Sequence, residues 1–417
     1  MKVYLSNPYG TIPGEEWREY RFFLLAKALE LKGHEVVWFT STFSHHFKIE
    51  RSKESKIISI SDNFKIHLIK SRPYSKNLSF GRILRDLTYG FNLMEILKND
   101  YPCPGAFFVG DSPVLFYYPS YWYCRKNNIP YIVDQMDLWP ELIVKSFPAG
   151  IRPFVEIFCF PIYQIRKKVF DNCFGFISLA KKYLDIPMSI SRSIVNKPNA
   201  VIYNGIDVDE FRLQMTIVDP NIDKKLGNKS VDEIWFIFAG TLGPSYDLET
   251  MLHGFLNLNN KCKLIIAGDG SERTYVENFI KENELNNVKY IGKMSKNSLP
   301  YLYSKCDIGL NTYGVYSNVE MSDKFYDYTG AGLVVLNSLQ GEVKDFVEKF
   351  GIGYNYQASN LESFIDKLQL IINSDNLALM KEKSFELGSF FDQKKQLNKF
   401  TQFMELVERS LIFKHKS

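Results

Sequence analysis

Short runs of apolar, β-branched and aromatic residues alternate with stretches of helical periodicity along the whole chain. In the first half these runs are residues 2–6, 35–39, 64–69, 105–110, 130–134 and 174–178. In the second half they are residues 234–240, 263–268, 288–292, 307–311 and 333–337. Parallel strands need long crossover connections, which are usually helices. The alternation therefore predicts an α/β protein with two parallel sheets.

The two series of predicted strands are separated by residues 196–233, which are rich in turn formers and charged residues. We expect a hinge followed by a surface loop there, with a domain boundary near residue 204. The domains would be residues 1–204 and residues 205–417, and 417 residues suffice for two cores. A final helix at about residues 395–412 could pack back on the first domain.

The charge balance limits the partners that the chain could have. Its 51 basic and 47 acidic residues give a formal charge of +4, so nothing demands a nucleic acid. An anionic ligand or an anionic membrane surface remains compatible with that charge.

Other features of composition bear on the cell compartment. The six cysteines show no CxxC or Cys/His spacing, which argues against a zinc site and against a disulfide framework. The N-terminal apolar run is too short for a signal peptide, and no run reaches the ~18 apolar residues of a spanning helix. We therefore expect a cytoplasmic protein.

Glycines follow two of the predicted strands in the second half. Gly240 and Gly243 lie in the turn after residues 234–239, and Gly268 and Gly270 lie in the sequence IAGDG. Glycine lets backbone N–H groups approach a phosphate at a helix N-terminus, and open α/β sheets bind ligands at the carboxyl ends of their strands. A tight turn without a ligand explains either glycine pair taken alone.

One lysine stands where a helix favours an acidic residue. Ser322 reads as an N-cap, which puts Lys324 in the first turn, beside unsatisfied N–H groups and the positive end of the helix dipole. An anion bound there would explain the lysine. A surface ion pair between Lys324 and Asp327, at i and i+3, is the alternative.

These motifs occur in an order that resembles a known enzyme family. The glycine turn at residue 240, the IAGDG loop, YIGKM and SDKFYDYTGAGLVVLN together resemble the nucleotide-sugar-binding half of family 4 glycosyltransferases, which have the GT-B fold. Residues 7–48, DQMDLWPE and YNGIDVDEF resemble the acceptor half and hinge of members that build bacterial surface polysaccharides. The resemblance covers nearly the whole chain.

The resemblance implies two Rossmann-like domains that face an interdomain cleft. It implies transfer of a sugar, with retention, from a nucleotide-diphosphate donor to a saccharide acceptor that we expect to be lipid-linked, in capsule, O-antigen or exopolysaccharide synthesis. It implies no metal and no other cofactor, and a place at the inner face of the cytoplasmic membrane. A GT-B sugar-nucleotide epimerase and a nonenzymatic nucleotide-sugar-binding protein are the alternatives.

The resemblance also assigns roles on the donor side. Asp327 takes the place of the glutamate that binds the donor ribose, whereas Val319 stands where the family has its other glutamate. Thr241 replaces the arginine that many members use to hold the diphosphate, and Lys324 could supply that charge instead. The expected donor-binding residues are Gly14, Gly240, Thr241, Gly243, Gly268, Gly270, Gly292, Met294, Lys324 and Asp327.

Candidates for catalysis and acceptor binding lie mainly in the first half. His45 is a candidate proton shuttle or a structural histidine, and Asp137 could orient an acceptor hydroxyl or cap a helix. With Lys324 they form the catalytic set. The expected acceptor-binding residues are Arg18, His46, Asp111 and Glu141.

Residues 147–170 combine aromatic and aliphatic side chains with Arg152, Arg166, Lys167 and Lys168. Such a segment could lie in an anionic membrane interface or be buried in the first domain. Pro161 is expected to interrupt any long helix there.

Overall fold

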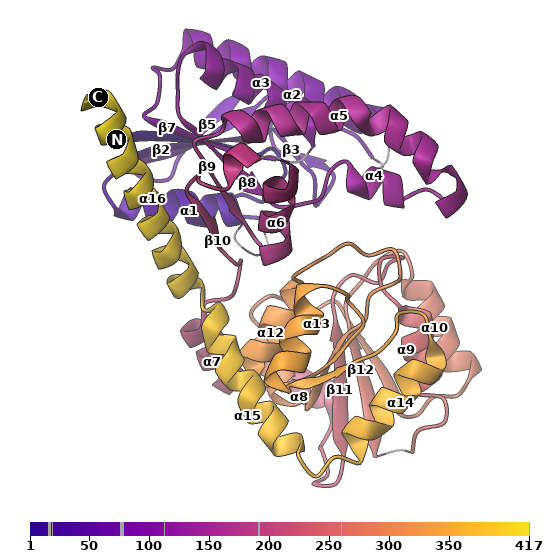
Figure 1. The fold of residues 1–417 in the computed structure, drawn as a ribbon. Coiled ribbons are helices and arrows are strands. Elements are labelled where there is room, and N and C mark those ends of the chain that lie inside the picture. The colour runs from indigo at the N-terminus through magenta and orange to yellow at the C-terminus, as the bar shows by residue number, and fades with distance from the viewer. Residues whose placement is uncertain are drawn as a thin grey trace. The chain divides into compact units, whose positions relative to one another are not determined.

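A computed structural model describes residues 1–15, 18, 20–75, 79–111, 113–190, 192–259 and 261–416. The chain divides into two compact units. The first unit comprises Met1–Tyr203 together with Gln396–Ser417, and the second comprises Asn204–Lys395. Figure 1 shows the helices and strands of each unit.

The first unit contains a sheet of order β10-β9-β8-β7-β1-β2-β6-β5. All of its pairings are parallel except that of β5 with β6. Its strands are β1 (Lys2–Ser6), β2 (Glu35–Ser41), β5 (Lys56–Ser59), β6 (Phe64–Ile69), β7 (Ala106–Gly110), β8 (Tyr131–Gln135), β9 (Gly175–Ser178) and β10 (Asn199–Val201), beside a separate hairpin of β3 (Phe43–Ser44) and β4 (Ile49–Glu50).

Helices cover both faces of this sheet. They are α1 (Arg21–Leu31), α2 (Phe80–Asn99), α3 (Val114–Lys126), α4 (Glu141–Lys145), α5 (Arg152–Asn172), α6 (Lys181–Ile190) and α16 (Gln393–Lys416), with 3-10 turns at η1 (Ala149–Ile151) and η2 (Arg192–Ile194). Side chains of α2, α3 and α5 pack against one face, and those of α1 and α16 pack against the other.

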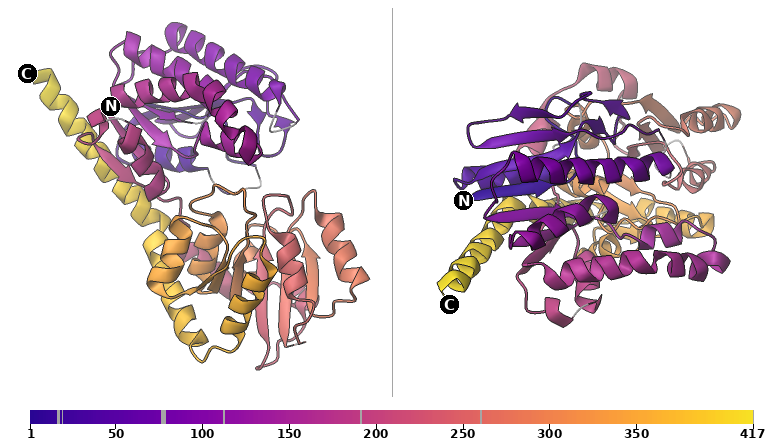
Figure 2. Two further views of the ribbon diagram at one scale, coloured as in Figure 1. Left: turned by 45° about the vertical axis from the view of Figure 1, so that its right-hand side comes forward. Right: turned by 90° about the horizontal axis from the view of Figure 1, so that it is seen from above.

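The C-terminal helix α16 supplies part of the core of the first unit. Its Phe400, Phe403, Met404 and Val407 are buried with residues of β1 and α1. Their spacing of three and four residues places them on one face of the helix. Both views in Figure 2 show α16 running along the first unit to the C-terminus.

A buried ion pair joins α1 to the sheet. The Arg21 guanidinium donates to both carboxylate oxygens of Asp134, at 2.8 and 3.0 Å, and to the carbonyl oxygen of Ile202. Burial raises the pKa of Asp134, while Arg21 lowers it. Buried charges are tolerated when they are paired and hydrogen-bonded, as both are here.

The second unit has a parallel sheet of order β13-β12-β11-β14-β15-β16. Its strands are β11 (Ile234–Ala239), β12 (Cys262–Ala267), β13 (Val288–Gly292), β14 (Ile308–Asn311), β15 (Val334–Asn337) and β16 (Gly353–Asn355). Its helices are α7 (Val208–Thr216), α8 (Pro220–Leu226), α9 (Leu248–Gly254), α10 (Arg273–Glu282), α11 (Leu299–Ser304), α12 (Asp323–Ala331), α13 (Glu342–Phe350), α14 (Leu361–Ile372) and α15 (Leu377–Gly388), with η3 (Ser389–Phe391).

The predicted fold class is confirmed, and two local predictions are wrong. The expected surface loop within residues 196–233 contains α7 and α8, because Asp207 and Asp219 act as N-caps and Pro220 opens the second helix. Helix α5 also continues through Pro161, although proline removes one helical hydrogen bond.

In each sheet, the chain adds successive strands first toward one edge and then toward the other, so the strand order reverses at one point. In the first unit this point lies between β1 and β7, and in the second it lies between β11 and β14. Open α/β sheets bind ligands beyond the carboxyl ends of the strands at such switch points. The fold therefore directs attention to the loops that follow these strands.

Candidate functional site

The loops after β11, β12 and β13 are hydrogen-bonded to one another beyond the sheet. The backbone N–H of Gly240 donates to Ala267 O at 2.9 Å, and that of Gly268 donates to Gly292 O at 3.0 Å. The Leu242 N–H donates to Asp269 O at 3.0 Å. The loops therefore extend the parallel pairing of the strands and form a connected edge.

Two glycines in these loops are required by packing. A Cβ at Gly268 would lie 1.8 Å from Gly240 O, and a Cβ at Gly270 would lie 2.2 Å from Leu242 O. Any larger residue would force the loops apart. The IAGDG sequence thus has a structural reason that does not depend on a ligand.

Lys324 reaches into the same edge, inside a group of aromatic rings. Its Nζ lies 3.7 Å from the ring centroid of Tyr246, 4.9 Å from that of Phe238 and 5.2 Å from that of Tyr313. We call these four residues the lysine box. The rings offer their negative faces to the ammonium group, which partly replaces its lost hydration.

The lysine box also explains Gly240. A Cβ there would lie 2.7 Å from Lys324 Nζ, so a side chain would displace the ammonium group. Burial lowers the pKa of Lys324, while Tyr246, Asp323 and Asp327 raise it. The amino group is therefore easier to deprotonate than that of a solvated lysine.

Helix α12 holds Lys324 over the β11/β14 switch point. The Ser322 hydroxyl accepts from Phe325 N and donates to Asn311 Oδ1 at the end of β14. The Tyr328 hydroxyl lies 3.3 Å from both Ile237 O and Leu310 O. These bonds to β11 and β14 fix the helix, and hence the lysine, relative to the sheet.

The carboxylates near α12 are engaged within the second unit. Asp327 is buried, and its Oδ2 accepts from the Tyr303 hydroxyl at 3.2 Å. The neighbouring Glu320 accepts from Glu342 N at the start of α13, whereas Val319 is exposed. Glu320 therefore caps a helix.

The other donor-side candidates lie at the same edge with different exposures. Thr241 is exposed, Gly243 is buried and Met294 is half-buried. Gly292 has φ +79° and no atom within 4 Å of a built Cβ, so backbone conformation, and not crowding, accounts for the glycine. Gly14, the one candidate of this set in the first unit, has φ +89° and likewise open space around it.

His45 lies close to other charged and aromatic side chains of the first unit. Its Nδ1 is hydrogen-bonded to the Tyr74 hydroxyl and lies 3.4 Å from Lys48 Nζ. Burial, followed by Lys48, Arg82 and Arg85, lowers the pKa of His45 to about 3. The imidazole is thus neutral and weakly basic at neutral pH.

Asp137 follows β8 and interacts electrostatically with Arg82. The surrounding chain raises the pKa of Asp137 to about 6, and Arg82 lowers it. The side chain is nevertheless exposed, and contact with water favours the ionised carboxylate. His46 is also exposed, whereas Arg18, which accepts from the Thr11 hydroxyl through its carbonyl oxygen, is half-buried.

Asp111 and Glu141 hold loops in place. Asp111 Oδ1 accepts from Met136 N at 3.1 Å, which links the ends of β7 and β8. Both oxygens of Glu141 accept from the buried Arg166, at 2.8 and 2.6 Å, and Arg166 also donates to Trp139 O. Both carboxylates therefore shape the loop that carries Asp137.

Tyr246 and Tyr313 belong to the site but were not predicted from the sequence. Both are separated in sequence from Lys324, and the aromatic signal in TLGPSYD and LNTYG is common in loops. Their position in the loops that follow β11 and β14 was the only indication available.

Comparison with known proteins finds similarity to glycosyltransferases. Residues 219–384 match the family model of the glycosyl transferases group 1. This segment is less than half of the chain and lies in the second unit. No curated protein matches by sequence.

Solved structures are similar to the chain over nearly its full length. Sucrose-phosphate synthase from Thermosynechococcus elongatus has a TM-score of 0.72 at 14% identity, over 98% of this chain and 99% of the other. Anabaena HepE in complex with UDP has a TM-score of 0.67 at 13% identity, over 97% and 100%. WaaG, a glycosyltransferase involved in lipopolysaccharide biosynthesis, has a TM-score of 0.63 at 14% identity, over 95% and 98%. The chain has the GT-B fold.

Within the part of the chain that the structure describes, no helix is both long and apolar enough to cross a membrane.

Proposed function

We propose that the chain is a glycosyltransferase that moves a sugar from a nucleotide-diphosphate donor to a saccharide acceptor. The observation that carries this proposal is the buried Lys324 ammonium group beside Gly240, at the β11/β14 switch point. A cation at a helix N-terminus is unfavourable unless an anion neutralises it. The family match over residues 219–384 and the GT-B fold support the diphosphate of a nucleotide sugar as this anion.

In this proposal the second unit binds the donor. Lys324 contacts the diphosphate, and Thr241 and Gly243 border it in the loop after β11. Asp327 accepts from the ribose hydroxyls, and the Tyr303 hydrogen bond orients its carboxylate. Gly292 and Met294 lie beside the base, while Gly268 and Gly270 permit the close packing of the loops.

The proposed reaction proceeds with retention and without a metal ion or other cofactor. The bond between the anomeric carbon and the diphosphate oxygen breaks, and a bond to the acceptor oxygen forms on the same face. The departing phosphate takes the acceptor proton, and Lys324 stabilises the charge that develops on it. This route needs no strong base, which agrees with the weakly basic His45.

On the acceptor side we propose that Asp137 and His45 orient a hydroxyl group. Arg18 and His46 would border the same region, because, like His45, they follow β1 and β2. Gly14, in the loop after β1, stays a proposed donor-binding residue. Asp111 and Glu141 would act through the loop that they hold.

We further propose that the acceptor is lipid-linked, in capsule, O-antigen or exopolysaccharide synthesis at the inner face of the cytoplasmic membrane. Helix α5 supports contact with an anionic surface, since Phe154 and Phe158 are 65% and 84% exposed and Ile157 and Phe160 lie exposed beside them. Arg152 and Lys167 flank this face. An apolar strip with basic neighbours suits a membrane interface.

Liposome sedimentation tests the membrane contact. Phe154→Ser with Phe158→Ser should abolish salt-sensitive binding to anionic vesicles, while Phe91→Ser with Leu406→Ser, at exposed positions on α2 and α16, should leave it intact. Equal binding by both pairs would remove the membrane proposal.

The activity is tested by incubating the full chain with UDP-, GDP- and dTDP-sugars and following the products by NMR, with and without saccharide acceptors. Acceptor-dependent formation of a glycosidic bond with retained configuration is expected. Epimerised donor in the absence of acceptor would indicate an epimerase instead. Binding without turnover of any donor would indicate a nonenzymatic binding protein.

A further inference from the structure

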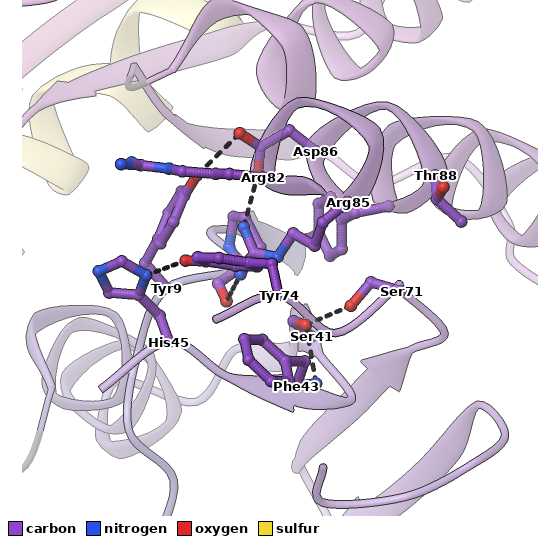
Figure 3. Close-up of polar contacts among 12 residues, drawn as sticks. Tyr9, Ser41, Phe43, His45, Ser71, Tyr74, Arg82, Arg85, Asp86 and Thr88 are labelled. Atoms are coloured by element: carbon purple, nitrogen blue, oxygen red, sulfur yellow. Dashed lines mark hydrogen bonds and ion pairs between the residues drawn. The ribbon is translucent and has the colours of Figure 1, made fainter. Parts of the chain in front are cut away.

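The first unit contains a second concentration of positive charge, at the carboxyl edge of its own sheet. Its side chains come from the loops after β1, β2 and β6 and from the first turns of α2, and Figure 3 labels all of its members except Lys48. We call this group the arginine–tyrosine cluster. Its members are Tyr9, His45, Lys48, Tyr74, Arg82, Arg85 and Asp86.

Arg85 forms the fixed part of the cluster. It is fully buried, its Nη1 donates to Asp86 Oδ1 at 2.6 Å, and its Nη2 donates to Pro8 O at 2.9 Å. Its guanidinium lies 4.3 Å from the ring centroid of Tyr9. Its Nε has no hydrogen-bond partner among the described residues. One donor of a rigid, permanently charged group is therefore left over.

Asp86 is fully used inside the cluster. The Tyr9 hydroxyl lies 2.8 and 2.9 Å from its two oxygens, in addition to the contact with Arg85. The same hydroxyl accepts from Arg82 Nε at 3.2 Å. Asp86 thus neutralises one cation and orients a second through Tyr9, as the dashed lines in Figure 3 indicate.

The positive charge of the cluster exceeds its negative charge. Three of its members, Lys48, Arg82 and Arg85, are cations, and Asp86 is its carboxylate. Among the described residues outside the cluster, the exposed Asp137 also interacts electrostatically with Arg82. Burial, followed by Arg82 and Arg85, lowers the pKa of Lys48 to about 8. A neighbouring ammonium group is therefore repelled, which is the mark of a positive field.

The start of helix α2 adds to this field. Ser79 caps the helix by accepting from Arg82 N, and the first turn contains no acidic residue. The dipole of this 20-residue helix places partial positive charge beside Arg82.

We propose that the arginine–tyrosine cluster binds the phosphoryl group of a phosphorylated saccharide acceptor. A phosphoryl group carries close to two charges at neutral pH and three acceptor oxygens, which matches the Arg82 guanidinium group, the Lys48 ammonium group and a helix N-terminus, with the buried Arg85 adding positive charge behind them. Arg82, Lys48 and His45 are half-exposed, so an anion can reach them. The acceptor assignment rests on the proposed glycosyltransferase function.

The binding of inorganic pyrophosphate to the full-length chain tests the site by calorimetry. The titrations use a Lys324→Met background, in which the donor-side cation is removed. Lys48→Gln with Arg82→Gln should weaken binding by at least about tenfold. The control pair Lys27→Gln with Lys65→Gln removes the same charge from exposed positions of the first unit and should change the affinity by less than about twofold.

A rescue variant separates binding from folding. Lys48→Arg with Arg82→Lys keeps both charges and should recover most of the affinity lost in the glutamine pair. Undetectable binding by the parent, or equal weakening in the glutamine pair and the control pair, would overturn the proposal.

Two further probes distinguish the source of the phosphoryl group. Tighter binding of micellar farnesyl diphosphate than of pyrophosphate would indicate a lipid-linked acceptor, and tighter binding of glucose 6-phosphate would indicate a soluble sugar phosphate. In either case the glutamine pair should bind the more tightly bound probe more weakly than the parent does.

The outcome is independent of the transferase assay. If no donor turns over but the glutamine pair loses pyrophosphate, the phosphoryl site stands and the acceptor assignment falls. If transfer occurs and the glutamine pair transfers with an unchanged KM for a phosphorylated acceptor, the glycosyltransferase stands and the cluster is only scaffold.

Discussion

The lysine box in the second unit and the arginine–tyrosine cluster in the first begin from the same local signal. A serine caps each helix, with the Ser79 hydroxyl accepting from Arg82 N at 3.3 Å and the Ser322 hydroxyl accepting from Phe325 N at 3.2 Å. A cation then stands in the first turn of each helix, Arg82 in α2 and Lys324 in α12. Each position is locally unfavourable for a cation.

The surroundings of the two cations differ. Lys324 is enclosed by three aromatic rings, and burial lowers its pKa. The cluster holds two guanidinium groups that stay charged, anchored by Asp86. In the proposed reaction, the titratable Lys324 contacts the diphosphate leaving group, whose charge changes during transfer. The permanently charged Arg82 contacts the acceptor phosphoryl group, whose charge does not change. The identity of the cation and its neighbours, and not the helix start, separates the two roles.

The largest expected effect concerns the anchor of the cluster. Arg85→Met should lower the free energy of unfolding by about 3–5 kcal/mol, because it leaves the buried Asp86 without its guanidinium partner. Denaturant melts measure this. Adding Asp86→Asn should restore part of the loss. A loss under about 1 kcal/mol would show that Tyr9 alone satisfies Asp86, and the contrast with Lys324 would disappear.

The next effect concerns Asp327. Asp327→Asn keeps the shape and removes the charged acceptor, and a charge-assisted hydrogen bond contributes ~1.5–3 kcal/mol. Donor affinity should therefore fall by roughly ten- to a hundredfold in calorimetric titration. Tyr303→Phe, which keeps the carboxylate, should change affinity much less. If Asp327→Asn binds the donor normally and is less stable, the carboxylate serves only the Tyr303 contact.

Lys324→Met should affect the binding of a nucleoside diphosphate and of a free nucleoside differently. Binding of the nucleoside diphosphate should weaken by about tenfold, whereas the free nucleoside, which lacks the anionic groups, should bind unchanged. The free energy of unfolding should hold or rise slightly, within about 1 kcal/mol, because an unfavourable cation leaves the helix start. Normal diphosphate binding with a clear loss of stability would make the lysine box a scaffold.

The smallest effect is the pH dependence of Lys324. Its folded-state pKa lies below the unfolded value of about 10.4, so the native amino group is deprotonated across the interval between them while the unfolded one is still protonated. The free energy of unfolding therefore rises with pH across that interval. Denaturant melts should show this rise for the parent chain relative to Lys324→Met. A difference that stays flat up to about pH 10 would contradict the lowered pKa.

The sequence by itself determined the architecture. Alternating strand and helix signals predicted parallel sheets, and the predicted strands from residues 2–6 to 333–337 correspond to β1 through β15, except for short β3, β4, β5 and β10. Burial of whole strands leaves an apolar run that is visible without coordinates. The helix start at Ser322 and the unusual Lys324 were also visible, because capping is local.

The tertiary structure alone decided which side chains meet. Tyr246, Tyr313 and Phe238 surround Lys324 because β11 and β14, whose sequences are far apart, lie side by side at the switch point. Tyr9, Tyr74 and Arg85 meet for the same reason in the first unit. Such contacts are set by strand order, which no local pattern encodes.

Tertiary packing also decided the state of the groups that meet. Glu141 was a candidate ligand in the sequence, and Arg166 from α5 engages both of its oxygens. His45 was a candidate proton carrier, and the burial and positive charge around it hold its pKa at about 3. The residue type determines which ionisable group is present. Folding brings distant segments close to that group, and their charges and the loss of water shift its pKa, which decides its protonation state at neutral pH.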